Sequence, residues 1–284
     1  MASSAFQTMY RQEIIEGFDQ NAALLRDCVT TEHMSKGGSA VFLVSDGSSN
    51  SATTRGINGL IPARNLSLTQ NTASMAEWND LVTVNNFNIF ASQGDLKKPM
   101  QREVMSTINK KIDDDILTQL NTATNDTGSA VAGSVDLVGK AKVILGVNKV
   151  PNDGNLTLIA SPALVEYMKR SPSFASSDYV NLRPYADGGK PAFADMPMVY
   201  NWNGMKVIEH PNIPGIGTSA EKCFLFHKNA IGHAIDKNTI DATVGYNEEQ
   251  NYTYSRATAF MASKLLQNSG VVVINHDGSA FAAA

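Results

Sequence analysis

The sequence has few cysteines and no long apolar run, and each absence excludes a class of protein. Cys28 and Cys223 are the only cysteines among 284 residues, so we expect no disulfide framework and interpret both thiols as reduced, buried small hydrophobes. Residues 1–11 are polar and lack the apolar core of a signal peptide. No run approaches the roughly 18 apolar residues of a membrane helix. We therefore expect no secretory leader and no membrane partner.

A strong excess of basic charge is also missing. The formal net charge is −4 and the isoelectric point is about 5.7. This balance argues against a protein that follows nucleic acid through a strongly basic surface. Any contact with DNA is expected to be weak, non-specific and largely screened. A hydrophobic content of 43% still allows a sizeable core, in one large domain or two small ones.

Sequence signatures of catalysis are missing as well. There is no G-x-S-x-G, P-loop or Cys/His motif. Residues 215–220, Gly-Ile-Gly-Thr-Ser-Ala, resemble a dinucleotide-binding loop, but a proline-rich stretch precedes them and a strand-like run at Cys223 follows. We interpret them as an ordinary loop. An acid–base pair drawn from distant parts of the chain stays open. Otherwise we expect no enzyme and no catalytic or cofactor-binding residue.

Histidines and one acidic run are the remaining candidates for a metal site. His227 and His233 are six residues apart, which fits neither a helical i,i+4 pair nor a finger-like set, and the other three are isolated: His33, His210 and His276. Residues 113–115 are all aspartate, but consecutive helical residues point about 100° apart and cannot converge on one ion. We predict structural histidines, a solvated acidic helix face and no metal site. The basic residues beside or on this helix are also interpreted as solvated: Lys36, Lys97, Lys98, Arg102, Lys110 and Lys111.

What the sequence does contain is a long polar excursion. Residues 37–96 are rich in Ser, Thr and Asn, and only six of them are charged: Asp46, Arg55, Arg64, Glu77, Asp80 and Asp95. Strand-like runs at residues 40–44 and 82–90 predict a β-hairpin. An exposed hairpin with so little charge invites aggregation unless a partner covers it, and a connection this long needs a functional reason. We predict an arm that packs on a neighbouring copy of the chain.

One long helix follows the excursion. Pro99 suits its first turn, and apolar residues then recur at every fourth position: Met100, Val104, Ile108, Ile112, Ile116 and Leu120. Such a stripe drifts around a helix of 3.6 residues per turn, so the helix should cross a sheet obliquely. We predict this helix over residues 99–121.

The other segments mix helices and strands. A helix is predicted over residues 135–145, and another begins with Ser161 as N-cap and Pro162 as its first residue. Residues 171–201 are interpreted as loop, residues 251–266 are ambiguous, and strands are predicted at residues 156–160, 205–208, 223–226, 231–235 and 271–274. No linker divides the chain, so the expected fold class is α+β.

The N-terminal segment, residues 4–35, has an apolar residue at every fourth position near its start: Phe6, Tyr10, Ile14 and Phe18. This spacing predicts a partly helical segment with one apolar face. Such a face either caps the core of its own subunit or lies on a neighbour.

The order of these segments resembles that of the major capsid proteins of tailed bacteriophages, which share the Hong Kong 97-type fold. The resemblance covers nearly the whole chain. It is carried by the long helix from Pro99, by Tyr167, and by residues 6–13 (FQTMYRQE), 38–44 (GSAVFLV), 158–162 (LIASP), 176–179 (SSDY), 204–208 (GMKVI) and 226–234 (FHKNAIGHA).

The resemblance implies an N-terminal arm (1–36), an extended E-loop (37–96), a peripheral domain with a spine helix (97–134 and 241–284) and an axial domain (135–240). Copies would form pentamers and hexamers of an icosahedral shell around double-stranded DNA. Assembly would take place in the host cytoplasm, and the final location would be the virion capsid.

Two departures bear on the partners. No lysine lies within residues 37–96, so we do not expect the lysine cross-link that some family members form. The arm is too short to include a scaffolding segment, which favours a separate scaffolding protein, with a portal as a further partner and a decoration protein as an open alternative. An encapsulin-like nanocompartment and a soluble enzyme with a dispersed active site remain as alternative functions.

Overall fold

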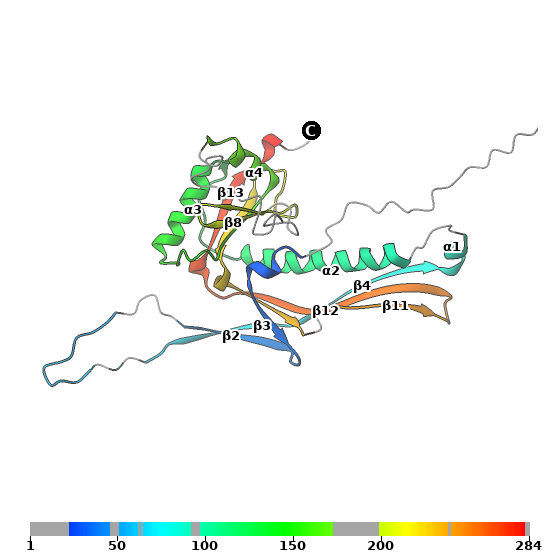
Figure 1. Cartoon of the computed structure of the whole chain (residues 1–284), viewed down its shortest axis with the longest axis horizontal. Coiled ribbons are helices and arrows are strands. Elements are labelled where there is room, and N and C mark those ends of the chain that lie inside the picture. The colour runs from blue at the N-terminus through cyan, green and yellow to red at the C-terminus, as the bar shows by residue number, and fades with distance from the viewer. Residues whose placement is uncertain are drawn as a thin grey trace, which may run out of the picture.

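The computed structural model describes residues 23–45, 51–61, 63, 65–91, 97–172, 199–237 and 240–281. The helices are α1 (Asn86–Ala91), α2 (Lys97–Leu120), α3 (Val135–Val147) and α4 (Pro162–Lys169), together with short 3-10 turns such as η1 (Arg26–Cys28). The strands lie in two larger sheets and one hairpin, and α2 connects the two larger parts of the fold (Figure 1). The mixture of helices and strands confirms the predicted α+β class.

The first sheet forms the core of a body that α3 and α4 cover (Figure 1). Its strand order is β5 (Val131–Ala132), β13 (Val271–Asp277), β9 (Glu221–His227), β6 (Leu156–Ala160), β8 (Met205–Glu209) and β7 (Val199–Trp202). Every residue of β6 is buried. Strands covered on both faces have continuous apolar sequences, which is why short apolar runs sufficed to predict β6, β8, β9 and β13.

The helices of this body begin where the sequence predicted. The Ser161 hydroxyl accepts a hydrogen bond from the Leu164 amide at 3.1 Å, and Pro162 is the first residue of α4. Ser134 caps α3 in the same way through the Leu137 amide. Each cap satisfies one of the amides that the first helical turn leaves without a partner.

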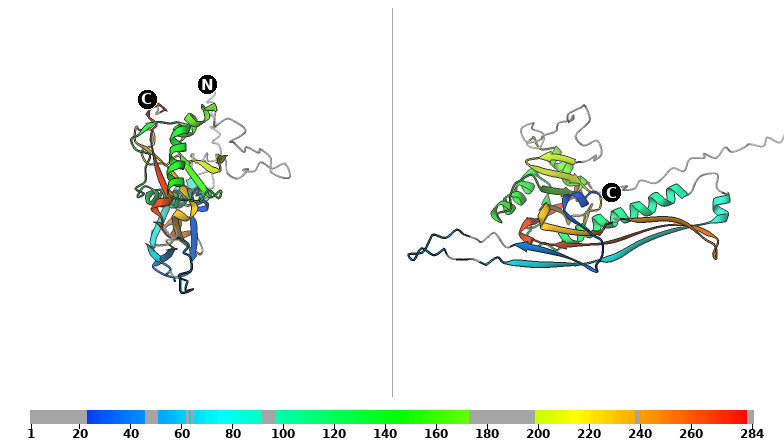
Figure 2. Two further views of the ribbon diagram at one scale, coloured as in Figure 1. Left: turned by 90° about the vertical axis from the view of Figure 1, so that its left-hand side faces the viewer. Right: turned by 60° about the horizontal axis from the view of Figure 1, so that its bottom comes forward.

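The second sheet is long and lies under α2. It contains β1 (Thr30–Met34), β10 (Ile231–Asp236), β12 (Tyr252–Leu265) and β11 (Asp241–Asn247), and β4 (Ala76–Asn85) pairs with the other edge of β12. Figure 2 shows α2 running along the strands β4 and β12. The ambiguous residues 251–266 are therefore mainly strand. The face of β12 beneath α2 carries small residues, which let the helix approach closely: Thr253, Ser255, Ala257 and Ala259.

The four-residue stripe of α2 is buried along its whole length, as predicted. Val104 and Ile108 pack with Ala257 and Ala259 of the long sheet. Residues further along α2, beginning with Ile112, belong instead to the core of the body. The drift of the stripe thus allows one helix to stabilise two packing layers.

The hairpin is formed by β2 (Ser39–Ser45) and β3 (Leu68–Ser74), which pair in antiparallel register from Ser39–Ser74 to Ser45–Leu68. The predicted second strand at residues 82–90 is strand only as far as Asn85, and its predicted pairing with residues 40–44 was wrong. Residues 76–85 form β4 and pair with β12, and α1 follows. The error arose because β3 is mostly polar, whereas β4 carries the apolar alternation of a strand that lies against α2.

Other sequence predictions differ from the structure in detail. Strands β1 and β11 were not predicted, and β7 lies at the end of a segment interpreted as loop. Residues 173–198 and the apolar positions of the N-terminal arm from Phe6 to Phe18 lie outside the described residues. Among the described helices, none combines the length and the apolar character that a membrane span requires.

Candidate assembly interface

The hairpin projects from the rest of the subunit (Figure 1). Its strand β2 carries apolar side chains on both faces. Ala40 and Phe42 are buried against the subunit, whereas Val41 and Leu43 on the opposite face are 44% and 64% exposed. Further large apolar residues between or near the two strands are also exposed: Ile57, Leu60, Ile61, Leu66 and Leu68. So many exposed large apolar side chains on one projecting segment are typical of a protein–protein contact.

The base of the hairpin is fixed to the subunit. The Phe42 ring lies so close to Gly232 of β10 that a Cβ at that position would be 2.9 Å from the ring. Ala73, Ala234 and Ala262 complete the apolar cluster around it. The side-chain amide of Asn71 also donates to the Leu266 carbonyl at 3.4 Å. The base is therefore anchored while the apolar outer face stays uncovered.

Asp113 connects three separate segments. Its side chain is fully buried. Its two carboxylate oxygens accept hydrogen bonds from the backbone amides of Leu24 and Leu25, each at 3.0 Å, and Oδ2 lies 3.2 Å from Nε2 of His210. The interpretation of residues 113–115 as a wholly solvated face was wrong at Asp113. Asp113 lies four and seven residues before the buried Leu117 and Leu120, which was the available signal for its burial.

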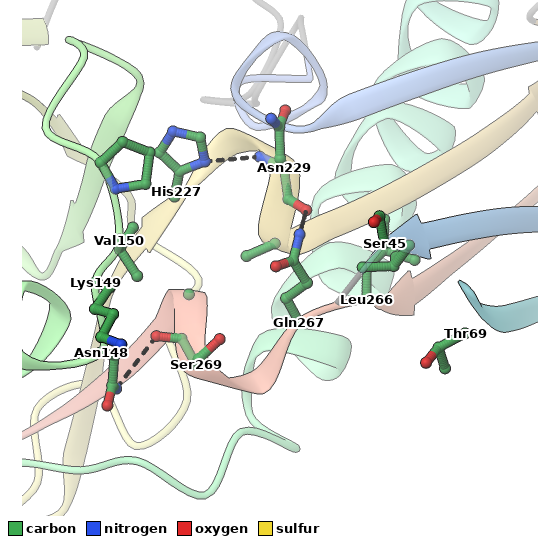
Figure 3. Close-up of a pocket in the computed structure, with 14 residues that line it drawn as sticks. Ser45, Thr69, Asn148, Lys149, Val150, His227, Asn229, Leu266, Gln267 and Ser269 are labelled. Atoms are coloured by element: carbon green, nitrogen blue, oxygen red, sulfur yellow. Dashed lines mark hydrogen bonds between the residues drawn. The ribbon is translucent and has the colours of Figure 1, made fainter. Parts of the chain in front are cut away.

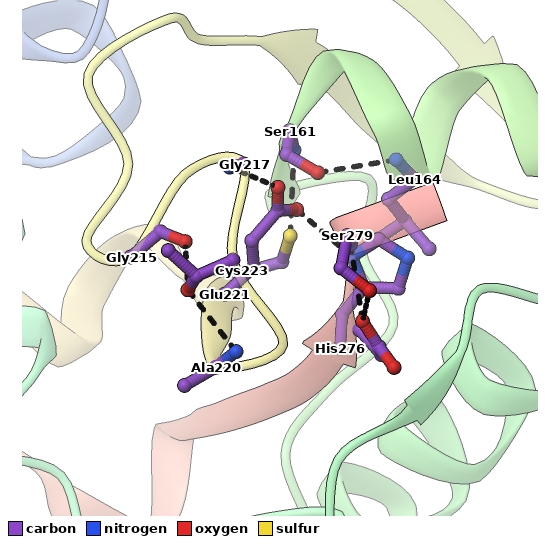
Figure 4. A network of polar contacts seen from close by, with 11 residues as sticks. Ser161, Leu164, Gly215, Gly217, Ala220, Glu221, Cys223, His276 and Ser279 are labelled. Carbon is purple, nitrogen blue, oxygen red and sulfur yellow. Dashed lines mark hydrogen bonds and ion pairs between the residues drawn. The ribbon is translucent and has the colours of Figure 1, made fainter. Parts of the chain in front are cut away.

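A second buried carboxylate organises the glycine-containing loop (Figure 4). Oε1 of Glu221 accepts a hydrogen bond from the Gly217 amide at 2.7 Å, and Oε2 lies 2.9 Å from Nδ1 of His276. Residues 215–220 lie in turns ahead of β9, so the loop prediction is confirmed. The amide that a dinucleotide loop would offer to phosphate is donated here to the protein's own carboxylate. The loop therefore has a structural role.

His227 repeats the arrangement of His210. In both histidines, Nδ1 accepts a hydrogen bond from the backbone amide of the asparagine two residues later. The distance is 3.1 Å from Asn212 to His210 and 3.2 Å from Asn229 to His227. The proton must then be on Nε2, which faces a carboxylate. For His227 that carboxylate is Asp153, at 3.1 Å. Two hydrogen bonds from Asn155 lower the pKa of Asp153. The one from its side chain has the larger effect, and the one from its backbone has the smaller.

His227 also lines a cavity of about 410 Å³ between the hairpin and the body. Figure 3 shows Ser45 and Thr69 of the hairpin on one side and Asn148, Val150 and His227 of the body on the other. Hydrogen bonds within the body hold its wall, including those from Asn148 to the Ser269 carbonyl and from Gln267 to the Asn229 carbonyl. The cavity has a mixed lining, in which amide and hydroxyl side chains lie beside apolar ones such as Val150 and Leu266.

The remaining polar candidates are structural. His233 is fully buried with Nδ1 2.9 Å from the Ser263 hydroxyl, and desolvation lowers its pKa to about 4. Within the described part of the chain, no three His, Cys, Asp or Glu residues are grouped so that they could hold a metal ion.

The two cysteines match their prediction. Both thiols are free and buried. Burial raises the pKa of Cys28, and it raises that of Cys223 to about 12. Such thiols remain protonated and unreactive at neutral pH. Cys223 also accepts a hydrogen bond from the Ser161 amide at 3.3 Å, within the body core.

Comparisons with known proteins agree with this picture of a structural subunit. A solved structure from Mycobacterium phage Che8 superposes with a TM-score of 0.73 at 17% identity, over 98% of this chain and 99% of the other. The capsid of Ralstonia phage GP4 gives a TM-score of 0.69 at 12% identity, over 96% and 95% of the two chains. The capsid of a native GTA particle, computed with C5 symmetry, also gives 0.69, at 11% identity over 96% of each chain.

The chain has no significant match among curated proteins. A family model described as phage capsid protein, however, matches residues 2–278. The structural likeness at this low identity concerns the fold, and the family match extends over nearly the whole sequence. The protein therefore belongs to the phage capsid protein family and has the Hong Kong 97-type fold.

Proposed function

We propose that this chain is the major capsid protein of a tailed phage and assembles with copies of itself, as pentamers and hexamers, into an icosahedral shell around double-stranded DNA. The observation that carries this proposal is the hairpin with a buried inner face, Ala40 and Phe42, and an uncovered apolar outer face, Val41 and Leu43. Full burial of one exposed Leu or Ile contributes about 1.5–3 kcal/mol. If several such residues were buried against a neighbouring subunit, their combined free energy would hold a shell together.

The domain assignment is part of the same proposal. Residues 1–36 are the N-terminal arm, residues 37–96 contain the E-loop, and α2 is the spine helix of the peripheral domain (97–134 and 241–284). Residues 135–240 are the axial domain, except that β10 within this range pairs in the long sheet and β13 of the C-terminal segment pairs in the body sheet. The pairing of β4 with β12 supports counting residues 76–85 with the peripheral domain, so that the projecting part of the E-loop is the β2–β3 hairpin.

A pair of double variants tests the role of the hairpin. Leu43→Asp with Leu60→Asp places charge on the exposed apolar face, whereas Leu43→Met with Leu60→Met keeps that face apolar. We expect closed shells by negative-stain electron microscopy for the wild type and the Met variant only. The Asp variant should stay unassembled with an unchanged circular dichroism spectrum and urea midpoint. Shells of normal size from a folded Asp variant would contradict the proposal.

The content of purified shells tests whether the shell encloses DNA. Shells from phage-producing cells should contain DNA, in weak contact with a subunit of net charge −4. An enzyme cargo without DNA would favour the nanocompartment instead. We also propose assembly in the host cytoplasm with a separate scaffolding protein and a portal, and a decoration protein stays open. Co-purification with immature and mature particles identifies these partners.

A further inference from the structure

An open groove runs between α2 and the edge strand β11. It has a volume of about 630 Å³ and is lined by Lys98, Gln101, Arg102 and Met105 of the helix and by Ala242 of the strand. The wall that α2 forms is therefore basic and polar, apart from Met105, which is apolar like Ala242 on the opposite wall.

The floor of the groove continues along one row of β11. Ala242, Val244 and Tyr246 pair with Ala257, Ser255 and Thr253 of β12, which are buried beneath α2. Cross-strand partners point to the same side of a sheet. The row on β11 therefore faces the α2 layer, yet Val244 and Tyr246 are 39% and 49% exposed. The helix covers β12 and β4 and leaves this apolar row open.

The first described residues of the N-terminal segment lie on α2, and one face of this helix leads from there to the groove. The amides of Leu24 and Leu25 are bound to Asp113 of α2. Positions 109, 105, 102 and 98 precede Asp113 at spacings of four and three, so they follow one face of the helix. From position 113 to position 98 this face extends about 22 Å at 1.5 Å per residue.

The preceding 22 residues have the length and chemistry to follow that path. A helix over residues 6–18 would span about 18 Å, and residues 19–23 would cover the rest. Its apolar face would carry four residues: Phe6, Tyr10, Ile14 and Phe18. Residues 1–22 also contain three acidic residues against one basic residue, Arg11: Glu13, Glu16 and Asp19. The groove wall with Lys98 and Arg102 has the opposite charge.

We propose that residues 1–22 dock on their own subunit in the groove between α2 and β11. The apolar face of the segment lies on Met105 and the Ala242–Val244–Tyr246 row, and its acidic residues lie beside Lys98 and Arg102. The segment covers the apolar row that α2 leaves open, and the Asp113 contact fixes the place on α2 from which the segment starts. This inference goes beyond the proposed function, since it concerns a single subunit before any shell forms.

A cross-linking pair with a matched control tests the docking. Ile14→Cys is combined with Ala242→Cys in one variant and with Thr243→Cys in the other. Residues 242 and 243 are adjacent and both exposed, but Thr243 pairs with Arg256 on the opposite face of the sheet. The full chain is treated before assembly with a short bis-maleimide, and products are identified by intact mass and peptide mapping. Buried Cys28 and Cys223 should contribute little background.

We expect an intrachain cross-link that is several-fold more abundant with residue 242 than with residue 243 and independent of protein concentration. Equal yields for the two variants, or no cross-link to residue 242, would overturn the proposal. A product that joins two chains and rises with concentration would also overturn it, because a neighbour's arm would then occupy the groove. The result does not depend on shell formation, so it is distinguishable from failure of the proposed function.

Discussion

Nε2 of His210 lies 3.2 Å from Oδ2 of Asp113, and both side chains are fully buried. Asp113 belongs to α2, and His210 follows β8 in the body. The same carboxylate holds the Leu24 and Leu25 amides. One side chain therefore joins the long helix, the body and the start of the described chain. Removing one partner from such a buried group leaves the others without hydrogen bonds, which costs more than the bonds contribute net.

Asp113→Ala should lower the free energy of unfolding by about 3 kcal/mol or more, because the buried Leu25 amide, the partly buried Leu24 amide and the His210 imidazole lose their partner. Urea unfolding of the unassembled chain measures this. The matched control is Asp114→Ala, since Asp114 is the exposed neighbour on the same helix, and its effect should stay within about 0.5 kcal/mol. Equal midpoints for the two variants would show that the Asp113 contacts contribute little.

Gly232→Ala should loosen the base of the hairpin. The new Cβ would be 2.9 Å from the Phe42 ring, so the ring must move and the cost is about 1–3 kcal/mol. The control is Gly139→Ala, where the Cβ meets nothing within 4 Å in α3, and which should stabilise by about 0.5–1 kcal/mol. Thermal unfolding compares the two variants. Replacing Phe42 by Leu should relieve part of the Gly232→Ala effect, and a lack of any coupling would contradict the contact.

Ser161→Ala should destabilise the chain by about 1 kcal/mol, because the Leu164 amide loses its cap. Ser161→Thr keeps the hydroxyl and is the control, with a smaller expected loss. Urea midpoints of the three proteins give the comparison. An Ala variant as stable as the Thr variant would show that another group satisfies the amide.

Local sequence signals predicted α2, α3 and α4 well, whereas α1 lies in residues that were predicted as strand. The four-residue stripe placed α2 over residues 99–121, and the structure has Lys97–Leu120. The Ser161-Pro162 pair identified the first residue of α4. These features depend on neighbouring residues only. The partner of β2 could not be found in this way, because the apolar pattern of β4 reports its burial under α2 and does not identify β12, some 170 residues later, as its partner.

The candidate interface was predicted only in outline. The low charge of residues 37–96 indicated an arm, and the exposed outer face of β2 agrees with it. The buried carboxylates were missed, since Asp113 and Glu221 become buried through segments far away in sequence: Leu24 and His210 for the first, His276 for the second. Composition gives no sign of such contacts. His210, His227, His233 and His276 are buried and hydrogen-bonded within the fold, but the sequence did not reveal their partners.

Acid should destabilise the chain through His233. Burial lowers its folded-state pKa to about 4, below the unfolded value of about 6.5. The unfolded chain therefore binds more protons between these values, and stability falls as the pH drops through this window. The groups that influence this histidine include Asp113 and Asp115 of α2, Arg26 of η1 and His33 of β1. The loss between pH 7 and pH 5 should be about 2 kcal/mol.

His233→Asn isolates this contribution, because the Asn amide can keep a hydrogen bond to Ser263 without titrating. Urea unfolding at pH 7 and pH 5 should show a loss about 2 kcal/mol smaller for this variant than for the wild type. Paired carboxylates contribute their own acid dependence to both proteins, so only the difference reports His233. The control is His33→Asn at an exposed position, which should retain most of the wild-type dependence. If the His233 variant kept the full pH dependence, the imidazole would have to be protonated within the fold at little cost.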